Sequence, residues 1–407
     1  MKFKHIDHLA GFLLALLTAT PMLRTQFAIP SIALILPIMA IFVLSVIKNY
    51  DAGRLFVRKN VAVHFYFLVL LFVYLLASNF WNPFDVSTRD PMLRIFLIIL
   101  TAAAVIGSLN ERVANYYINW VIFFAVFAAI TLFSEYLRLG NFSGYRLSDT
   151  LVRPQLMGLG TIFTVGKLLF LEDRKKKRLI VIIGFLLLGL AFGGARGALI
   201  LTFGLSILIL TYYFYLNDPK SYSIAEWFKN KSLRIFSFGS IILVIVAALQ
   251  VERTAHKMRR LFFGGELVSG GRTELWVNSV SSFLDSPIIG HGFRSSGILS
   301  HGRESWYPHN LFLEAMVDGG IIALIILLIV CFYPLIRTIE LFRKKLLSGK
   351  LWLPLMVGYI FLLFEFSKSN SMYEGRILMA LGIVLLIVVE RIKLPANQAI
   401  KAYQKLE

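Results

Sequence analysis

The chain has 407 residues, 57% of them hydrophobic, with a mean hydropathy of +0.73 and a net charge of +19. Soluble domains do not reach this hydropathy, and apolar runs long enough to span a bilayer recur along the whole length, which excludes a single soluble core. Many basic residues lie in short loops between those runs, which indicates control of membrane topology and not nucleic-acid binding. The sequence therefore predicts an all-α polytopic membrane protein, which contacts membrane lipids and no nucleic acid.

Hydropathy predicts twelve membrane spans within one integral membrane domain, residues 1–407. The first could pass for a signal peptide, but further spans follow at once and we interpret it as a membrane helix. If the N-terminus is cytoplasmic, every dense basic cluster in a short loop falls on the cytoplasmic side, so both termini are predicted to lie there. The single cysteine, Cys331, lies inside a span and excludes a disulfide framework. The predicted spans are 9–23, 27–47, 61–78, 95–109, 115–137, 155–171, 179–194, 197–216, 235–251, 319–336, 351–367 and 377–390.

The opposite, outer side is predicted to carry one large segment, 252–318. A connection of this length is uncommon unless it is functional. Within it, Thr273–Pro287 has the pattern of an amphipathic helix that lies in the membrane plane, with Trp276 as an interface anchor. Pro308 begins a second helical stretch that leads into the tenth span. Two shorter outer loops and a tight turn are predicted at 79–94, 138–154 and 193–197.

Arginines on the outer side depart from the positive-inside rule and therefore need a function or a partner. Arg196 stands alone between two apolar runs, and Arg272 opens the amphipathic helix. Several guanidiniums around one outer cavity can bind a diphosphate in bidentate fashion without a metal ion. The alternatives are that Arg196 snorkels to the headgroup layer and that Arg272 binds headgroups. The sequence has neither a metal-ligand pattern nor a Gly-rich phosphate loop, so no metal, ATP or other cofactor is predicted.

A histidine lies where the large segment enters the tenth span. His309 follows Pro308, and a histidine there can take a proton from a hydroxyl nucleophile because its ordinary pKa is near neutrality. Asn310 and Glu314 share one helix face beside it. The alternative is an interface histidine that bonds headgroups or a backbone carbonyl. Spacing does not separate this residue from the other histidines of the segment, which are His256, His291 and His301.

Four stretches of the chain carry a resemblance to a known family. "HNLFLEAMVDGGIIA", with His309, Asn310 and Gly320, resembles the signature of the O-antigen ligase and polymerase superfamily, although Ala323 stands where that signature has Gly, Thr or Tyr. "GGARGAL" looks like the family's Ser/Thr-x-Arg element. "GGRTELW…SPIIGHGF" is similar to the stretch that opens the family's large periplasmic loop. "YRLSDTLVRPQLMG", with Arg146 and Arg153, resembles a segment that lines the cavity.

The resemblance implies a membrane-embedded, GT-C-like glycosyltransferase of twelve helices in the bacterial inner membrane, with its active site facing the periplasm. Such an enzyme transfers a glycan from undecaprenyl diphosphate to a sugar hydroxyl, with inversion and without metal or nucleotide. The resemblance implies that Arg196 and Arg272 bind the diphosphate and that His309 is the general base. Arg146, Arg153, Asn310 and Glu314 are further candidates for substrate binding.

Within this superfamily we expect an O-antigen ligase, which attaches O-antigen to lipid A-core in lipopolysaccharide biosynthesis. The alternative is a polymerase that uses the same lipid-linked donor. Polymerases often carry an Arg-x10-Gly pattern in their outer loops. Five outer arginines lack a glycine at that distance: Arg146, Arg153, Arg272, Arg294 and Arg303. A transporter or lipid flippase is disfavoured because the two halves show no repeat and few charges lie mid-span.

Overall fold

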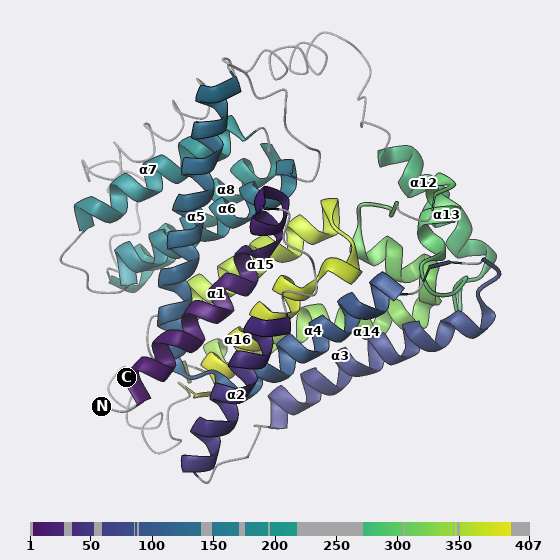
Figure 1. The fold of residues 1–407 in the computed structure, drawn as a ribbon, viewed down its shortest axis with the longest axis horizontal. Helices are drawn as coiled ribbons and strands as arrows, with labels where there is room; N and C mark the ends of the chain where they lie inside the picture. Colours follow the sequence, from purple (N-terminus) through teal and green to yellow (C-terminus); the bar gives the residue numbers. More distant parts are fainter. Residues whose placement is uncertain are drawn as a thin grey trace. The chain divides into compact units, whose positions relative to one another are not determined.

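In a computed structural model of the chain, the described residues form helices joined by loops, and none of them forms a β-strand (Figure 1). The residues described are 3–27, 35–52, 59–84, 86–87, 89–139, 149–170, 176–193, 196–217, 272–303, 306–344, 346–347 and 351–391. The helices are α1 (Phe3–Phe27), α2 (Ile35–Ala52), α3 (Lys59–Ala77), η2 (Ser78–Trp81), α4 (Arg89–Ser108), α5 (Glu111–Leu139), α6 (Asp149–Phe170), α7 (Lys176–Phe192), α8 (Arg196–Asn217), α12 (Arg272–Asp285), α13 (Ser295–His301), α14 (Leu311–Arg343), α15 (Trp352–Ser369), η3 (Met372–Glu374) and α16 (Arg376–Arg391).

Five of the described helices are long and apolar enough to cross a membrane: Lys4–Leu23, Lys59–Trp81, Asp90–Ser108, Glu111–Arg138 and Leu311–Arg343. This agrees with the predicted all-α, multi-pass membrane protein. The count of twelve spans and the cytoplasmic placement of both termini stay predictions. The predicted span 235–251 lies outside the described residues.

The chain divides into two compact units. The first unit consists of Met1–Leu17, Pro30–Tyr117 and Ser269–Glu407, and it contains α2–α4 and α12–α16. The second consists of Thr18–Ile29 and Ile118–Val268, and it contains most of α5 together with α6–α8. The prediction of one integral membrane domain over residues 1–407 stays a prediction.

The longest helix of the first unit, α14, extends well beyond the predicted span 319–336. Asn310 caps its N-terminus, because the Oδ1 atom accepts hydrogen bonds from the backbone N–H groups of Phe312 and Leu313. The backbone leaves helical geometry at Gly320, where φ is 64° and ψ is −161°. This left-handed conformation favours glycine, and a Cβ at this position would overlap the carbonyl of Ile288.

The turn at 286–292 fills the break in α14 with backbone hydrogen bonds. The N–H of His291 donates to the carbonyl of Val317, 2.8 Å away, which an unbroken helix would have offered to Ile321. The N–H of Ile321 instead donates to the carbonyl of Pro287, also at 2.8 Å. The predicted turn "SPIIGHGF" is therefore paired, backbone to backbone, with the helix that follows His309 in the sequence.

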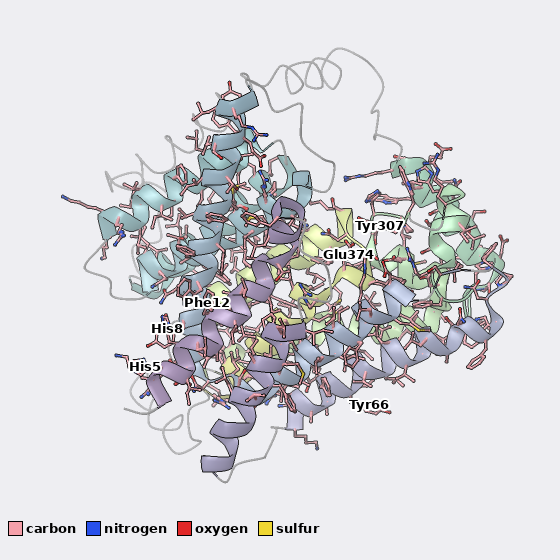
Figure 2. The ribbon with its side chains drawn as sticks, viewed as in Figure 1. His5, His8, Phe12, Tyr66, Tyr307 and Glu374 are labelled. Carbon is pink, nitrogen blue, oxygen red and sulfur yellow. The ribbon has the colours of Figure 1, made fainter. Side chains whose placement is uncertain are left out.

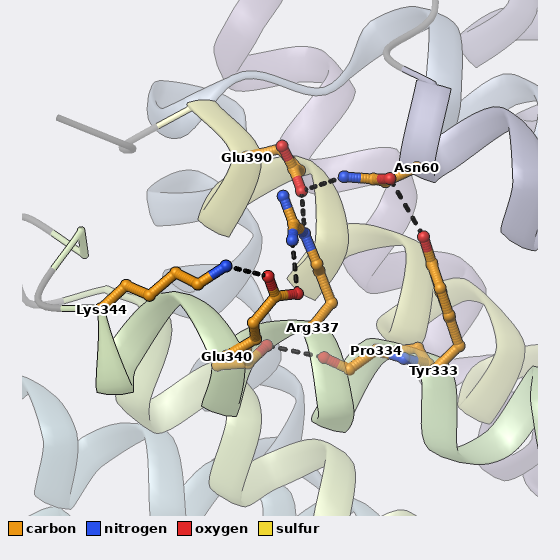
Figure 3. Close-up of polar contacts among 8 residues, drawn as sticks. Asn60, Tyr333, Pro334, Arg337, Glu340, Lys344 and Glu390 are labelled. Atoms are coloured by element: carbon orange, nitrogen blue, oxygen red, sulfur yellow. Dashed lines mark hydrogen bonds and ion pairs between the residues drawn. The ribbon is translucent and has the colours of Figure 1, made fainter. Parts of the chain in front are cut away.

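The two ends of α14 gather different segments of the first unit. Near its start, Asn82 Nδ2 of the loop at 79–94 donates to the carbonyl of Phe293 (2.6 Å). Tyr373 Oη, from the stretch between α15 and α16, donates to Asp318 Oδ2 of α14 itself (2.7 Å). Near its end, Arg337 reaches Glu390 of α16 (Figure 3). The predicted alternation of loops between two sides of a membrane stays a prediction.

Candidate active site

Helix α12 directs two side chains toward the segments that surround His309. Arg272 and Trp276 are four residues apart, so they lie on the same side of the helix. Arg272 Nη1 donates to the carbonyl of Lys368 at 3.2 Å, and Trp276 Nε1 donates to the carbonyl of Pro308 at 3.0 Å. The predicted amphipathic helix is thus confirmed as a helix, and it also holds the residue that precedes His309.

His309 is oriented by the end of α15. Its Nδ1 atom lies 3.4 Å from the carbonyl oxygen of Ser369, and Tyr307 Oη donates to the same oxygen at 3.3 Å. A carbonyl can only accept, so this contact assigns the proton of the neutral ring to Nδ1 and leaves the Nε2 lone pair able to accept. The backbone of His309 has a φ of 56°, an uncommon left-handed conformation of the kind that gathers at functional sites.

The surroundings of His309 favour its neutral form. Burial lowers the pKa of His309 below its ordinary value near 6.5, the positive charge of Arg272 acts in the same direction, and the hydrogen bond to Ser369 opposes them. Burial raises the pKa of Tyr307 above its ordinary value, with Glu374 adding to the effect, so its hydroxyl stays a donor. At neutral pH the site therefore presents an unprotonated imidazole.

Arg272 and His309 are fixed on neighbouring peptide groups. They are far apart in the sequence, yet they bond to the consecutive carbonyls of Lys368 and Ser369. Within the described residues, the contact with Lys368 is the one hydrogen bond of the Arg272 side chain, and no carboxylate forms a salt bridge with it. Its charge and its other N–H groups are left for an anion.

Glu374, whose charge helps to raise the pKa of Tyr307, lies near Tyr307 in the first unit (Figure 2). Glu374 Oε1 lies 2.7 Å from Arg94 Nη1, and both side chains are exposed. This surface pair therefore adds no uncompensated charge beside Arg272.

Two buried carboxylates lie on the first turns of α14. Glu314 Oε1 accepts from Ser371 Oγ at 2.7 Å, and Oε2 accepts from the N–H of Met372. Asp318 accepts from the N–H of Ser296 at 2.8 Å and from Tyr373 Oη, among other donors. Both acidic groups are therefore satisfied by neutral donors of the same unit.

The other predicted binding residues belong to the second unit. Arg153 is buried there and makes two hydrogen bonds to Glu135, at 2.9 and 2.8 Å. Arg196 is the first residue of α8, and its side chain lies outside the described part of the chain, as does the whole of Arg146. The structure brings together Arg272, His309, Asn310 and Glu314, whereas the roles of the second unit's arginines stay predictions.

The competing histidines have other partners. His291 Nε2 donates to the carbonyl of Ser282 at 2.6 Å, so its ring is tied to α12. His301 packs edge-on against Trp306, with ring centroids 4.0 Å apart. His256 lies outside the described residues. Among the histidines described in this segment, His309 is therefore the one whose ring contacts a carbonyl next to the one that Arg272 bonds.

Sequence reasoning missed the stretch that runs from the end of α15 through η3. Lys368 and Ser369 supply carbonyls to the site, and Ser371 and Tyr373 supply donors to the two carboxylates. The available signal was the polar run "SKSNSMYEGR", which separates the last two apolar runs.

Comparison with known proteins bears on the same region. Residues 179–328 match the family described as O-antigen ligase. Over this stretch the chain is similar to an O-antigen ligase domain. The stretch begins in α7, ends in α14, and includes Arg196, Arg272 and His309, so the predicted superfamily is confirmed.

A more distant similarity extends beyond residues 179–328. The "ComP-specific O-oligosaccharyltransferase" of Acinetobacter baylyi is 21% identical over 330 residues, which cover 73% of this chain. The chain spans about 57% of the length of that relative.

Proposed function

We propose that the protein is an O-antigen ligase of the bacterial inner membrane. It transfers O-antigen glycan from undecaprenyl diphosphate to lipid A-core at the periplasmic face. The observation that supports this most is the placement of Arg272 and His309 on consecutive carbonyls. Among the described residues, it sets a cation without a carboxylate partner beside an imidazole whose Nε2 has no hydrogen bond. The similarity to an O-antigen ligase domain over residues 179–328 supports the donor class.

In the proposed reaction, Nε2 of His309 takes the proton from the acceptor hydroxyl as its oxygen attacks the anomeric carbon of the donor sugar. The bond from that carbon to the diphosphate oxygen breaks, and the diphosphate leaves with the negative charge. Arg272, together with Arg196, binds this leaving group in bidentate fashion. Attack from the face opposite the leaving group gives inversion, and the guanidiniums supply the positive charge without a metal or nucleotide.

The remaining candidates have secondary roles in the proposal. Asn310 caps the start of α14, and Glu314 accepts a hydrogen bond from Met372, close to the carbonyl that His309 contacts. Both residues therefore help to fix the position of His309. Arg146 and Arg153 are proposed to line the cavity for the glycan. Undecaprenyl is wholly apolar, so its tail is proposed to lie among the lipid-exposed helices.

A second candidate differs only in the acceptor. The name of the Acinetobacter baylyi relative describes an O-oligosaccharyltransferase, which favours a hydroxyl on an acceptor other than lipid A-core. A polymerase would instead use the growing lipid-linked glycan as its acceptor. All three reactions share the donor, the base and the diphosphate-binding arginines.

His309→Ala, with His301→Ala as a matched control, tests the role of the base. Loss of a general base lowers the transfer rate by about 100-fold to 10,000-fold, so His309→Ala is expected to abolish long O-chains on lipid A-core while the control keeps them. Lipopolysaccharide ladders, with immunoblots for membrane insertion, measure the outcome. Normal ladders in the inserted His309→Ala protein contradict the proposal.

Arg272→Lys tests whether the fork of the guanidinium matters. This variant keeps the charge and loses bidentate geometry, so the KM for the lipid-linked donor is expected to rise. An unchanged KM shows that a point charge suffices.

Cells that lack the protein distinguish the acceptors. Loss of a ligase leaves full-length glycan on undecaprenyl diphosphate and bare lipid A-core. Loss of a polymerase leaves single repeat units attached to lipid A-core. Loss of an O-oligosaccharyltransferase leaves lipopolysaccharide intact and removes glycan from a protein.

A further inference from the structure

One short segment bonds both predicted reactive side chains. Residues 368–373, which run from the last two residues of α15 into η3, are called the tether below. On one side of the tether, the carbonyl of Lys368 accepts from Arg272, and the carbonyl of Ser369 accepts from His309. These carbonyls end α15 and have no partner within the helix, so the residues that follow them help to hold their direction.

The other side of the tether is bound by the buried carboxylates of α14. Glu314 accepts from Ser371 Oγ and from the N–H of Met372, and Asp318 Oδ2 accepts from Tyr373 Oη at 2.7 Å. Three successive residues of the tether are thus fixed to one helix.

The helix that holds the tether is itself fixed. Asp318 also accepts from the N–H groups of Arg294 (3.1 Å) and Ser296 (2.8 Å) at the start of α13, and its own carbonyl accepts from Gly292 at 2.9 Å. Glu314 is 2% exposed and Asp318 is 0% exposed, so water does not compete for these bonds. The first turns of α14, the tether and α13 are joined through two carboxylates.

We propose that Glu314, Asp318 and Tyr373 are positioning residues, which act through the tether to fix the direction of the Arg272 guanidinium and of the His309 ring. The inference rests on the proposed function, because it assigns these residues to the same transfer. It gives Glu314 an effect on chemistry without contact with substrate. Carboxylates suit the task because each can accept several bonds at once from different segments.

Tyr373→Phe is the decisive variant, because it removes one oxygen and keeps the ring. Tyr359→Phe is its matched control: Tyr359 is also fully buried, and its Oη donates to the carbonyl of Cys331 at 2.8 Å, away from the tether. Misplacement of reactive groups by about 1 Å can cost on the order of 100-fold in rate, so Tyr373→Phe is expected to lower kcat for glycan transfer by about tenfold or more. Tyr359→Phe is expected to keep the wild-type kcat.

A second measurement does not depend on transfer. Diethyl pyrocarbonate acylates unprotonated imidazole, and peptide mass spectrometry resolves His309 from the other histidines. Loosening of the tether in Tyr373→Phe is expected to expose His309 and to raise its acylation rate, whereas Tyr359→Phe leaves that rate unchanged. Glu314→Ala should behave like Tyr373→Phe, and Glu314→Gln, which keeps an acceptor oxygen for Met372, should recover most of the kcat.

The outcomes separate this proposal from the proposed function. A folded Tyr373→Phe protein with wild-type kcat and acylation rate overturns the positioning role, and so does an equal loss of kcat in Tyr359→Phe. Faster acylation of His309 in a protein whose wild type transfers no glycan supports the positioning role and overturns the proposed function. If Glu314→Ala does not fold, Tyr373→Phe still decides.

Discussion

The two ends of α14 satisfy their charged groups in opposite ways. At the start of the helix, Glu314 and Asp318 accept from hydroxyl and backbone N–H donors, and nearby Arg272 donates to a backbone carbonyl. At the far end, Arg337 bonds Glu340 and Glu390, and Lys344 bonds Glu340 (Figure 3).

This difference suggests that the far end of α14 serves stability and that its start serves the proposed transfer. At the far end, cations and carboxylates cancel each other and join α14 to α16, with Asn60 of α3 adding a bond to Glu390 at 2.6 Å. At the start, no carboxylate of the described residues pairs with the cation beside His309, to which the proposed function gives an anionic ligand. We therefore expect substitutions at the far end to change stability, and substitutions at the start to change transfer.

The largest effect on stability is expected at Gly320, where the break in α14 separates the two ends of the helix. Gly320→Ala places a Cβ against the carbonyl of Ile288 in a left-handed conformation, and we expect a loss on the order of 3–5 kcal/mol in the free energy of unfolding. Gly184→Ala in α7 is the control, since nothing lies within 4 Å of its added Cβ and a helical alanine is favoured over glycine by about 1 kcal/mol. Thermal unfolding of detergent-purified protein measures both. Equal stability of the two variants would contradict the role of the break.

Removal of the far-end arginine is expected to destabilise without impairing chemistry. Arg337→Met leaves Glu390, which is 6% exposed, without its cation, and breaking such a pair costs about 3 kcal/mol. Adding Glu390→Gln should restore part of the stability. Transfer per folded molecule should equal that of the wild type. A loss of kcat in folded Arg337→Met protein would show that the far end is also functional.

The pH dependence of transfer reports on the start of the helix. The pKa of His309 lies below 6.5, so the active neutral form persists to mildly acidic pH, and kcat/KM should fall by about tenfold per pH unit only below that pKa. The charged groups that act on it are Arg272 and His301, which lower the pKa, and Glu374, which raises it. His301→Ala should therefore move the acid limb slightly upward. A midpoint above pH 7 in the wild type would rule out the proposed base.

The smallest effect is expected at an exposed pair of the far end. Lys344, whose side chain is 60% exposed, bonds Glu340 one turn earlier on α14. Exposed pairs of this spacing contribute about 0.3–0.5 kcal/mol, so Lys344→Ala should shift the free energy of unfolding by no more than that. Raising the salt concentration should erase the difference from the wild type. A larger, salt-insensitive loss would place Lys344 inside the far-end network.

Hydropathy predicted where helices run, because a bilayer dictates their length and apolar content. It placed the tenth span at 319–336, whereas α14 extends from Leu311 to Arg343. Charged residues at both ends of the helix, such as Glu314 and Arg337, lower the local hydropathy, although bonding partners from other helices compensate them. Those partners are distant in the sequence, so no local pattern reveals them.

The site was predicted unevenly for a related reason. His309 and Arg272 carry distinctive side chains in a family-like spacing, and both could be named in advance. The carbonyls of Lys368 and Ser369 could not, because every residue has one and no residue type marks its use. The break at Gly320 was likewise hidden, since it depends on backbone pairing with Pro287 and His291.

The use of neighbouring carbonyls has a consequence for substrate range. Cα atoms joined by a trans peptide are 3.80 Å apart. Because the carbonyls of Lys368 and Ser369 belong to adjacent residues, substitution of their side chains does not change the backbone spacing between the acceptors of Arg272 and His309. In the proposed reaction, the surrounding residues can therefore vary with the sugar that is transferred, while the base and the cation keep the same backbone partners.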